Sequence, residues 1–154
     1  MERLKNIFDK IGSLIPGYRG YAERDNRRNC DKLLRNQIHK RLLRCGLIIN
    51  NRIKTEIKNN NLDTIRDFEN CQQKLNTLSE KIKYAPYGES SFFGDSQIKE
   101  DELEKIYKLD FNLYSLLEES QEYLTETSIV DILTYISSIE NMINKRNDFI
   151  KEHK

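Results

Sequence analysis

The sequence predicts an all-α protein, an up-down-up-down four-helix bundle preceded by a short N-terminal amphipathic helix. First, its 154 residues include only 2 prolines and 6 glycines, with 33% charged and 37% hydrophobic residues, whereas sandwiches and barrels need frequent turn residues. Second, long segments repeat apolar residues at helical spacing. Third, short connections between long helices favour antiparallel neighbours. We therefore predict an N-terminal helix in residues 1–15 and one bundle domain in residues 16–154; the alternative is a helical hairpin that completes its core only in an oligomer.

The N-terminal segment, residues 2–14, places five apolar side chains on one helical face: Leu4, Ile7, Phe8, Ile11 and Leu14. Pro16 ends this helix because the residue before a proline avoids the helical region. Packing on its own bundle is the favoured interpretation. Docking on a partner or on a membrane surface is the alternative.

The second helix is predicted from about Tyr21 to Lys58, after a turn that Gly17 and Gly20 permit. On a helical wheel its apolar stripe contains Leu34, Ile38, Leu42, Cys45 and Ile49. Towards the N-terminus the same stripe meets Arg24, Arg27 and Asp31 instead of apolar residues. The favoured interpretation is that the helix outruns the core and its end is solvated; the alternative is a buried polar layer used for binding.

Three further segments complete the prediction. A third helix begins with Asp63 as its N-cap and ends near Lys83, a fourth covers about 98–125, and a fifth begins near Thr127 and continues almost to the end of the chain. The intervening loop contains four aromatic residues, which we expect to fold back as a plug on the bundle end: Tyr84, Tyr87, Phe92 and Phe93. The alternative is that they line a groove for a ligand or a partner.

A polar layer follows from this topology because the second and fourth helices run in the same direction. Asp31 and Asp110 lie about 10 and 12 residues into their helices, and at a rise of about 1.5 Å per residue they reach similar heights. The fifth helix returns to that end at Arg146. A buried carboxylate is costly unless it is paired, so we predict a layer of Asp31, Asp110 and Arg27, with Arg146 as a further member.

The same end is the candidate binding surface. Its basic and aromatic residues have the chemistry to bind phosphate or to stack on bases: Tyr18, Arg19, Tyr21, Arg24, Arg27 and Arg28. Acidic residues, however, are interleaved with them. The charge is also divided along the chain: residues 1–60 have 15 Lys and Arg against 6 Asp and Glu, whereas residues 61–154 have 11 Lys and Arg against 19 Asp and Glu. An acidic segment of a partner, or the acidic half of a second copy, matches this pattern better than nucleic acid.

Signatures of catalysis are missing from the sequence. His39 and His153 lack the Glu-x-x-His spacing of di-metal bundles, there is no C-x-x-C zinc motif, and G-Y-R-G-Y lacks the strand that a dinucleotide loop requires. We expect no enzyme activity, metal, cofactor or small-molecule substrate, and we expect His39 to be solvated or to flank a helix. The unpaired spacing of Cys30, Cys45 and Cys71 fits a reducing cytoplasm.

Two segments, IPGYRGYAERDNRRNCDKLLR (15–35) and SFFGDSQIKEDELEKIYKLDFNLYSLLEE (91–119), resemble a family of small uncharacterised bacterial helical proteins. The resemblance covers about 50 residues and implies a bacterial helical domain. It implies no activity and no catalytic residues.

These observations predict a cytoplasmic, non-catalytic bundle that acts by protein–protein contact, through self-association or as an adaptor, using its Arg/Tyr-rich end. The alternative is phosphate or nucleic-acid binding at the basic start of the second helix. A further alternative is membrane-surface association through residues 1–15.

Overall fold

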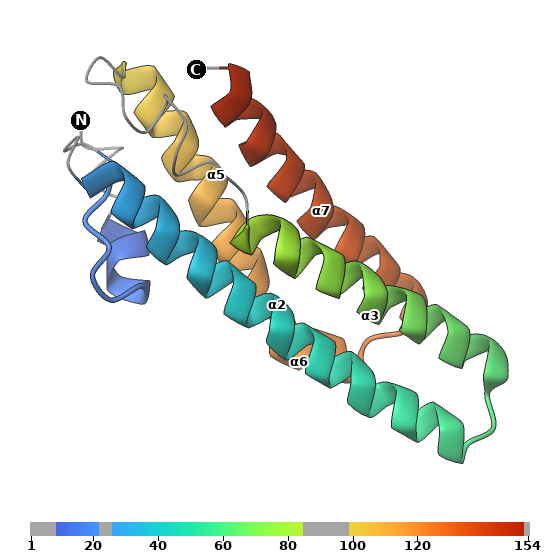
Figure 1. Cartoon of the computed structure of the whole chain (residues 1–154). Coiled ribbons are helices and arrows are strands. Elements are labelled where there is room, and N and C mark those ends of the chain that lie inside the picture. The colour runs from blue at the N-terminus through green and yellow to red at the C-terminus, as the bar shows by residue number, and fades with distance from the viewer. Residues whose placement is uncertain (1–8, 22–25, 85–98, 153–154) are drawn as a thin grey trace.

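The computed structural model describes residues 9–21, 26–84 and 99–152, which are helical apart from turns and short connections and contain no β-strand (Figure 1). The predicted all-α class is therefore confirmed. The helices are a short one at 9–14, α2 (Arg27–Lys58), α3 (Leu62–Lys83), α5 (Glu100–Glu118), α6 (Ser120–Glu126) and α7 (Ile129–Glu152).

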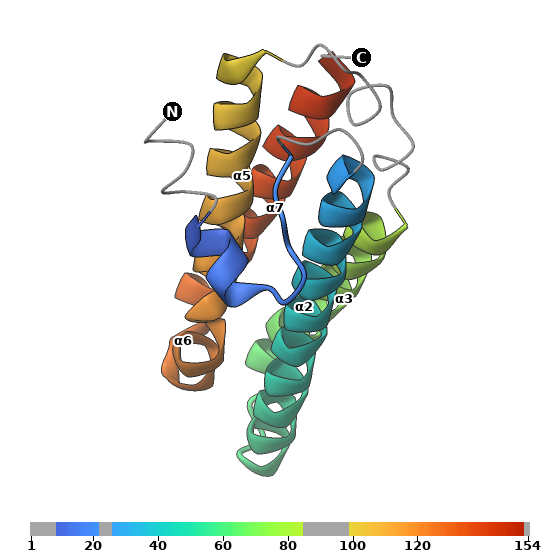
Figure 2. The same ribbon diagram turned by 90° about the vertical axis from the view of Figure 1, so that its left-hand side faces the viewer.

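The helices are arranged around one hydrophobic core. α2 packs along α3, α5 packs on α7, and contacts of α2 with α5 and α6, and of α3 with α7, join these pairs. α2 and α5 begin at the end of the molecule where α7 finishes, and the turn between α2 and α3 lies at the opposite end (Figures 1 and 2). The predicted apolar stripe of α2 faces this core: Leu34, Ile38, Leu42, Cys45 and Ile49 are all buried.

The turn between α2 and α3 uses three consecutive asparagines. Asn60 has a φ of 59°, a left-handed conformation that asparagine tolerates better than most residues. The predicted N-cap, Asp63, is wrong, because α3 begins at Leu62 with Asn61 as its N-cap. The carbonyl of Asn61 already accepts the first helical hydrogen bond, from the N–H of Ile65 at 3.1 Å. Asp63 lies in the first turn, where a negative charge favours the helix dipole.

The single helix predicted over residues 98–125 is wrong. α5 ends at Glu118 and α6 begins at Ser120, so Glu119 caps both helices. Neither proline nor glycine causes this break. The hydroxyl of Ser120 donates to the carbonyl of Leu117 at 2.6 Å, a side-chain bond of the kind that competes with regular helix. The guanidinium of Arg52, from α2, also binds the carbonyl of Leu124 at 3.0 Å and that of Thr127.

The N-terminal segment packs on the other helices as predicted, over the part that is described. Ile11 and Ile15 are fully buried, and the ammonium of Lys10 lies 5.5 Å from the ring centre of Phe111 in α5. Residues 1–8 fall outside the described part. So do Tyr87, Phe92 and Phe93 of the predicted aromatic plug. Tyr84, its remaining member, is 72% exposed, so the prediction is wrong for this residue.

Candidate functional site

A chain of buried polar side chains crosses the end of the molecule where α2 begins and α7 finishes, and Arg146 lies at its centre. Nε of Arg146 donates to Oδ1 of Asp110 at 2.6 Å, and Nη2 donates to Oδ1 of Asp31 at 2.5 Å. All three side chains are fully buried. One guanidinium therefore bridges a carboxylate of α2 and a carboxylate of α5, as charge-assisted pairs that a buried ion requires.

Asp31 extends this chain to α3. Its Oδ2 accepts from Nε of Arg35 at 2.8 Å, one helical turn along α2. Nη1 of Arg35 then donates to the carbonyls of Ile82 and Lys83 at 3.3 and 3.0 Å. These carbonyls belong to the last turn of α3, where a cation satisfies acceptors that have no partner within the helix. Asp31 thus orients the arginine that caps α3.

Asp110 extends the chain in the other direction, to the segment before α2. The hydroxyl of Tyr21 donates to Oδ2 of Asp110 at 2.6 Å. The backbone N–H of Tyr21 donates to the hydroxyl of Tyr107, and the two rings stack with their centres 5.2 Å apart. The backbone carbonyl of Tyr21 accepts a hydrogen bond from Nε of Arg27 at 2.7 Å. The buried network, which we define as Tyr21, Asp31, Arg35, Asp110 and Arg146, therefore joins α3, α2, α7, α5 and residues 15–21.

Burial and charge act in opposite directions on the ionisable groups of the network. Burial raises the pKa of Asp110, while Arg146 and the hydrogen bond from Tyr21 lower it. Burial on its own would lower the pKa of Arg146, but the carboxylates of Asp110 and Asp31 outweigh it and raise that pKa well above its usual value. Burial, with Asp110 second, raises the pKa of Tyr21 well above its usual value. The network therefore holds Arg146 charged and Tyr21 protonated at neutral pH.

Of the four residues predicted for the polar layer, the structure brings Asp31, Asp110 and Arg146 into contact. The favoured interpretation of a solvated helix end is wrong, because Arg27 and Asp31 are buried. Arg27 has 4% of its surface exposed, and its Nε donates a hydrogen bond to the backbone carbonyl of Tyr21. Arg35 was not predicted as a member of the layer. The available signal was its spacing of four residues from Asp31, which places the two side chains together on a helix.

The predicted binding surface is contradicted at three positions. Tyr18, Tyr21 and Arg27 are buried, because the segment before α2 folds down onto α5 and α7 instead of remaining in solvent. Arg19 and Arg28 are exposed, and Arg24 lies outside the described residues. The buried polar groups of this end form hydrogen bonds and ion pairs with one another. They therefore act as a structural clamp, a set of contacts that holds the helices together, more readily than as an open binding site.

Two further arginines of α2 also point towards neighbouring helices. Nη2 of Arg41 donates to the hydroxyl of Tyr114 at 2.7 Å and lies 3.4 Å from a carboxylate oxygen of Glu118, while Arg52 caps α6 as described. The cations of α2 therefore divide into inward arginines and outward residues. The exposed outward cations are Arg28, Lys32, Lys40, Arg44, Lys54 and Lys58.

The outward face of α2 combines these cations with exposed leucines. Leu43 and Leu47 are 44% and 66% exposed, and their spacing of four residues places them on the same stripe. The two acids of α2 do not interrupt this face, because Asp31 is buried and Glu56 is half-buried. We call Lys40, Leu43, Arg44, Leu47 and Lys54 the α2 face.

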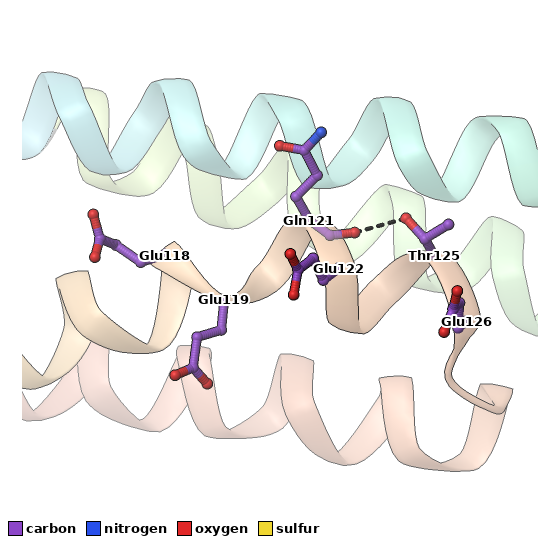
Figure 3. Close-up of a pocket in the computed structure, with 6 residues that line it drawn as sticks. All are labelled: Glu118, Glu119, Gln121, Glu122, Thr125 and Glu126. Carbon is purple, nitrogen blue, oxygen red and sulfur yellow. Dashed lines mark hydrogen bonds between the residues drawn. The ribbon is translucent and has the colours of Figure 1, made fainter.

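An acidic groove lies around α6 (Figure 3). Its volume is about 740 Å³, and its lining residues are Glu118, Glu119, Gln121, Glu122, Thr125 and Glu126. α6 packs directly on α2, so the α2 face and the acidic groove lie on neighbouring helices and have opposite charge. Within the described ranges, no three His, Cys, Asp or Glu side chains are placed to hold a metal ion.

His39 and the cysteines do not form a reactive site. Of the two positions predicted for His39, solvated or flanking a helix, the structure shows the second, because the residue is half-buried and its Nδ1 lies 2.9 Å from the carbonyl of Ser79 in α3. The three cysteines are buried, free thiols. Burial raises the pKa of each of them, that of Cys71 to about 11, which keeps them in the unreactive thiol form at neutral pH.

Comparison with protein-family models, with curated proteins and with solved structures found no match for the chain. The resemblance to a bacterial helical family therefore stays a prediction. In the part of the chain that the structure describes, no helix combines the length and the apolar character needed to cross a bilayer.

Proposed function

We propose that this protein is a non-catalytic, cytoplasmic helical bundle that works by protein–protein contact, with self-association as the primary mode. We further propose that its topology is up-down-up-down, with α5 and α6 together forming the third helix. The observation that carries the functional proposal is the α2 face, where two exposed leucines are flanked by cations. The three buried thiols suit a reducing compartment.

The α2 face is better suited to a partner than to water. A single exposed leucine needs no explanation, but two leucines one turn apart within a polar rim resemble the apolar centre and polar edge of an interface. The Arg/Tyr-rich end offers less, because Tyr18, Tyr21 and Arg27 are buried. We therefore move the proposed contact from that end of the molecule to the middle of α2.

We expect Leu47→Glu to weaken self-association by about tenfold or more, since burying a leucine contributes about 1.5–3 kcal/mol. The measurement is sedimentation equilibrium over a range of protein concentrations. The matched control is Leu62→Glu, because Leu62 is 78% exposed at the start of α3 and lies away from the α2 face. A wild-type chain that stays monomeric at every concentration would contradict the proposed function.

The second candidate is phosphate or nucleic-acid binding, and the uninterrupted cations of α2 favour it. Two features oppose it: leucines occupy the centre of the face, and α2 contains no aromatic residue on which a base could stack. Titration of a labelled oligonucleotide at several salt concentrations separates the candidates. Affinity that falls steeply with salt, through counterion release, and that is lost in Arg44→Gln would favour nucleic acid.

Membrane association through residues 1–15 has less support. Ile11 and Ile15 would have to leave the core to reach a lipid surface, because both are fully buried. A liposome co-sedimentation assay with the wild type and with Phe8→Asp tests this alternative directly, and equal recovery of both proteins in the supernatant would remove it.

A further inference from the structure

We infer that the partner of the α2 face is the acidic groove around α6 in a second copy of this chain, and that two copies dock reciprocally about a twofold axis. Each α2 face then lies on the other copy's α6. This inference rests on the self-association proposed above and names the surfaces that carry it.

The position of the two surfaces permits reciprocal docking. In a twofold interface each surface meets its complement on the other copy, so both must lie on the same side of the molecule. α2 and α6 are in direct contact, and Figure 3 shows α6 with α2 running along one side of it. Arg41 and Arg52 fix this arrangement within one chain, through Glu118 and the C-terminal carbonyls of α6.

The α2 face is opposite in charge to the acidic groove and longer than its row of glutamates. Lys40 and Lys54 are 14 positions apart on α2, or about 21 Å at the rise of an α-helix. Of the glutamates that remain available, Glu122 and Glu126 are four positions apart on α6, or about 6 Å, and Glu119 lies at the break directly before α6. The α2 face is therefore long enough to cover the groove. Glu118 is left out because it already pairs with Arg41 at 3.4 Å.

Apolar contact would hold the centre of this interface, with the charges at its edge. Leu43 and Leu47 occupy the middle of the α2 face, and Tyr123 of α6, which is 39% exposed and packs on Tyr135 with ring centres 5.0 Å apart, is the large apolar side chain that α6 presents next to the residues that line the groove. Rim charges of opposite sign guide encounter and fix register more than they add affinity. A twofold axis therefore lets the basic face and the acidic groove of each copy pair with those of the other copy at two contacts within one dimer.

Charge reversal tests this arrangement on the full chain. One variant reverses the α2 face (Lys40→Glu, Arg44→Glu, Lys54→Glu), and the other reverses the groove (Glu119→Lys, Glu122→Lys, Glu126→Lys). Either variant alone sets like charges against each other at both contacts, so we expect its dissociation constant to rise about tenfold or more. An equimolar mixture restores opposite charges at both contacts. We expect it to form a heterodimer within about threefold of the wild-type affinity.

The control variant carries Glu69→Lys and Glu80→Lys, two reversals at exposed positions of α3, and is expected to associate like the wild type. Far-UV circular dichroism verifies that every variant folds. A monomeric wild type would overturn the proposed function. An associating wild type whose affinity neither reversal changes would overturn this inference alone. Two weakened variants that fail to combine on mixing would overturn the reciprocal pairing.

Discussion

Arg146→Met lowers the free energy of unfolding by about 3–5 kcal/mol, the usual cost of removing one partner from a buried ion pair. This is a large share of the roughly 5–15 kcal/mol by which domains are stable. Arg146 is fully buried and is bound by both Asp31 and Asp110. Methionine fills much of the space of the arginine stem but leaves Asp110 without a cation and Asp31 with Arg35 as its remaining cation. The folded state then has to protonate Asp110 or admit water.

Urea unfolding followed by far-UV circular dichroism measures the loss. The matched control is Lys145→Met, because Lys145 is the exposed neighbour on the same helix and should change stability by no more than about 0.5 kcal/mol. Arg146→Lys should fall between the two, since lysine keeps the charge but not the planar fork that reaches both carboxylates. Equal stability of the Arg146→Met and Lys145→Met variants would show that the network contributes nothing.

The buried network specifies how the helices align more than it adds stability. Replacing a buried ionic triad by apolar residues is often neutral or stabilising, but such a replacement is incomplete here. Asp31 also orients Arg35, and Asp110 also accepts from Tyr21. Removing the three central residues would leave the cap of α3 and the anchor of residues 15–21 without their partners. The network therefore fixes how five segments are placed relative to one another. A purely apolar core, whose contacts are non-directional, would specify this placement less sharply.

The contact at the centre of the network could be predicted because it interrupts an otherwise regular pattern. Asp31 and Asp110 occupy core positions in long apolar stripes, and a carboxylate there requires a cation. The direction of the helices then identifies Arg146. Burial of Tyr18 and Tyr21 could not be predicted in the same way, because it depends on how residues 15–21 fold back onto α5. No local pattern in a segment with two glycines determines that path.

The break between α5 and α6 was also beyond sequence reasoning. No proline or glycine marks Glu119, and the apolar spacing continues through it. At the break the hydroxyl of Ser120 donates to the carbonyl of Leu117, and at the C-terminal end of α6 Arg52 binds the carbonyl of Leu124 from a different helix. The break between α5 and α6 matters for the proposed function because Glu122 and Glu126, which line the acidic groove, belong to α6.

At alkaline pH the protein should lose stability steeply, because buried tyrosines keep their protons in the folded state. Burial, reinforced by Asp110, raises the pKa of both Tyr18 and Tyr21 well above the usual value, and burial raises that of Tyr135. In the unfolded chain the same groups ionise near pH 10. Above that pH the unfolded state binds fewer protons than the folded state, so the free energy of unfolding falls as pH rises, by about 1.4 kcal/mol per pH unit for each tyrosine.

Tyr21→Phe separates the two roles of this hydroxyl. The variant loses the hydrogen bond to Asp110, so it should be less stable than the wild type by about 1–3 kcal/mol at neutral pH, but its stability should fall less steeply above about pH 10. Urea midpoints at increasing pH, with phenolate absorbance recorded in parallel, measure both effects. Tyr123→Phe is the control, because that side chain is 39% exposed and its removal should leave the slope almost unchanged. A wild type whose tyrosines all ionise near pH 10 without unfolding would contradict the burial of Tyr18 and Tyr21, and with it the clamp at this end of the molecule.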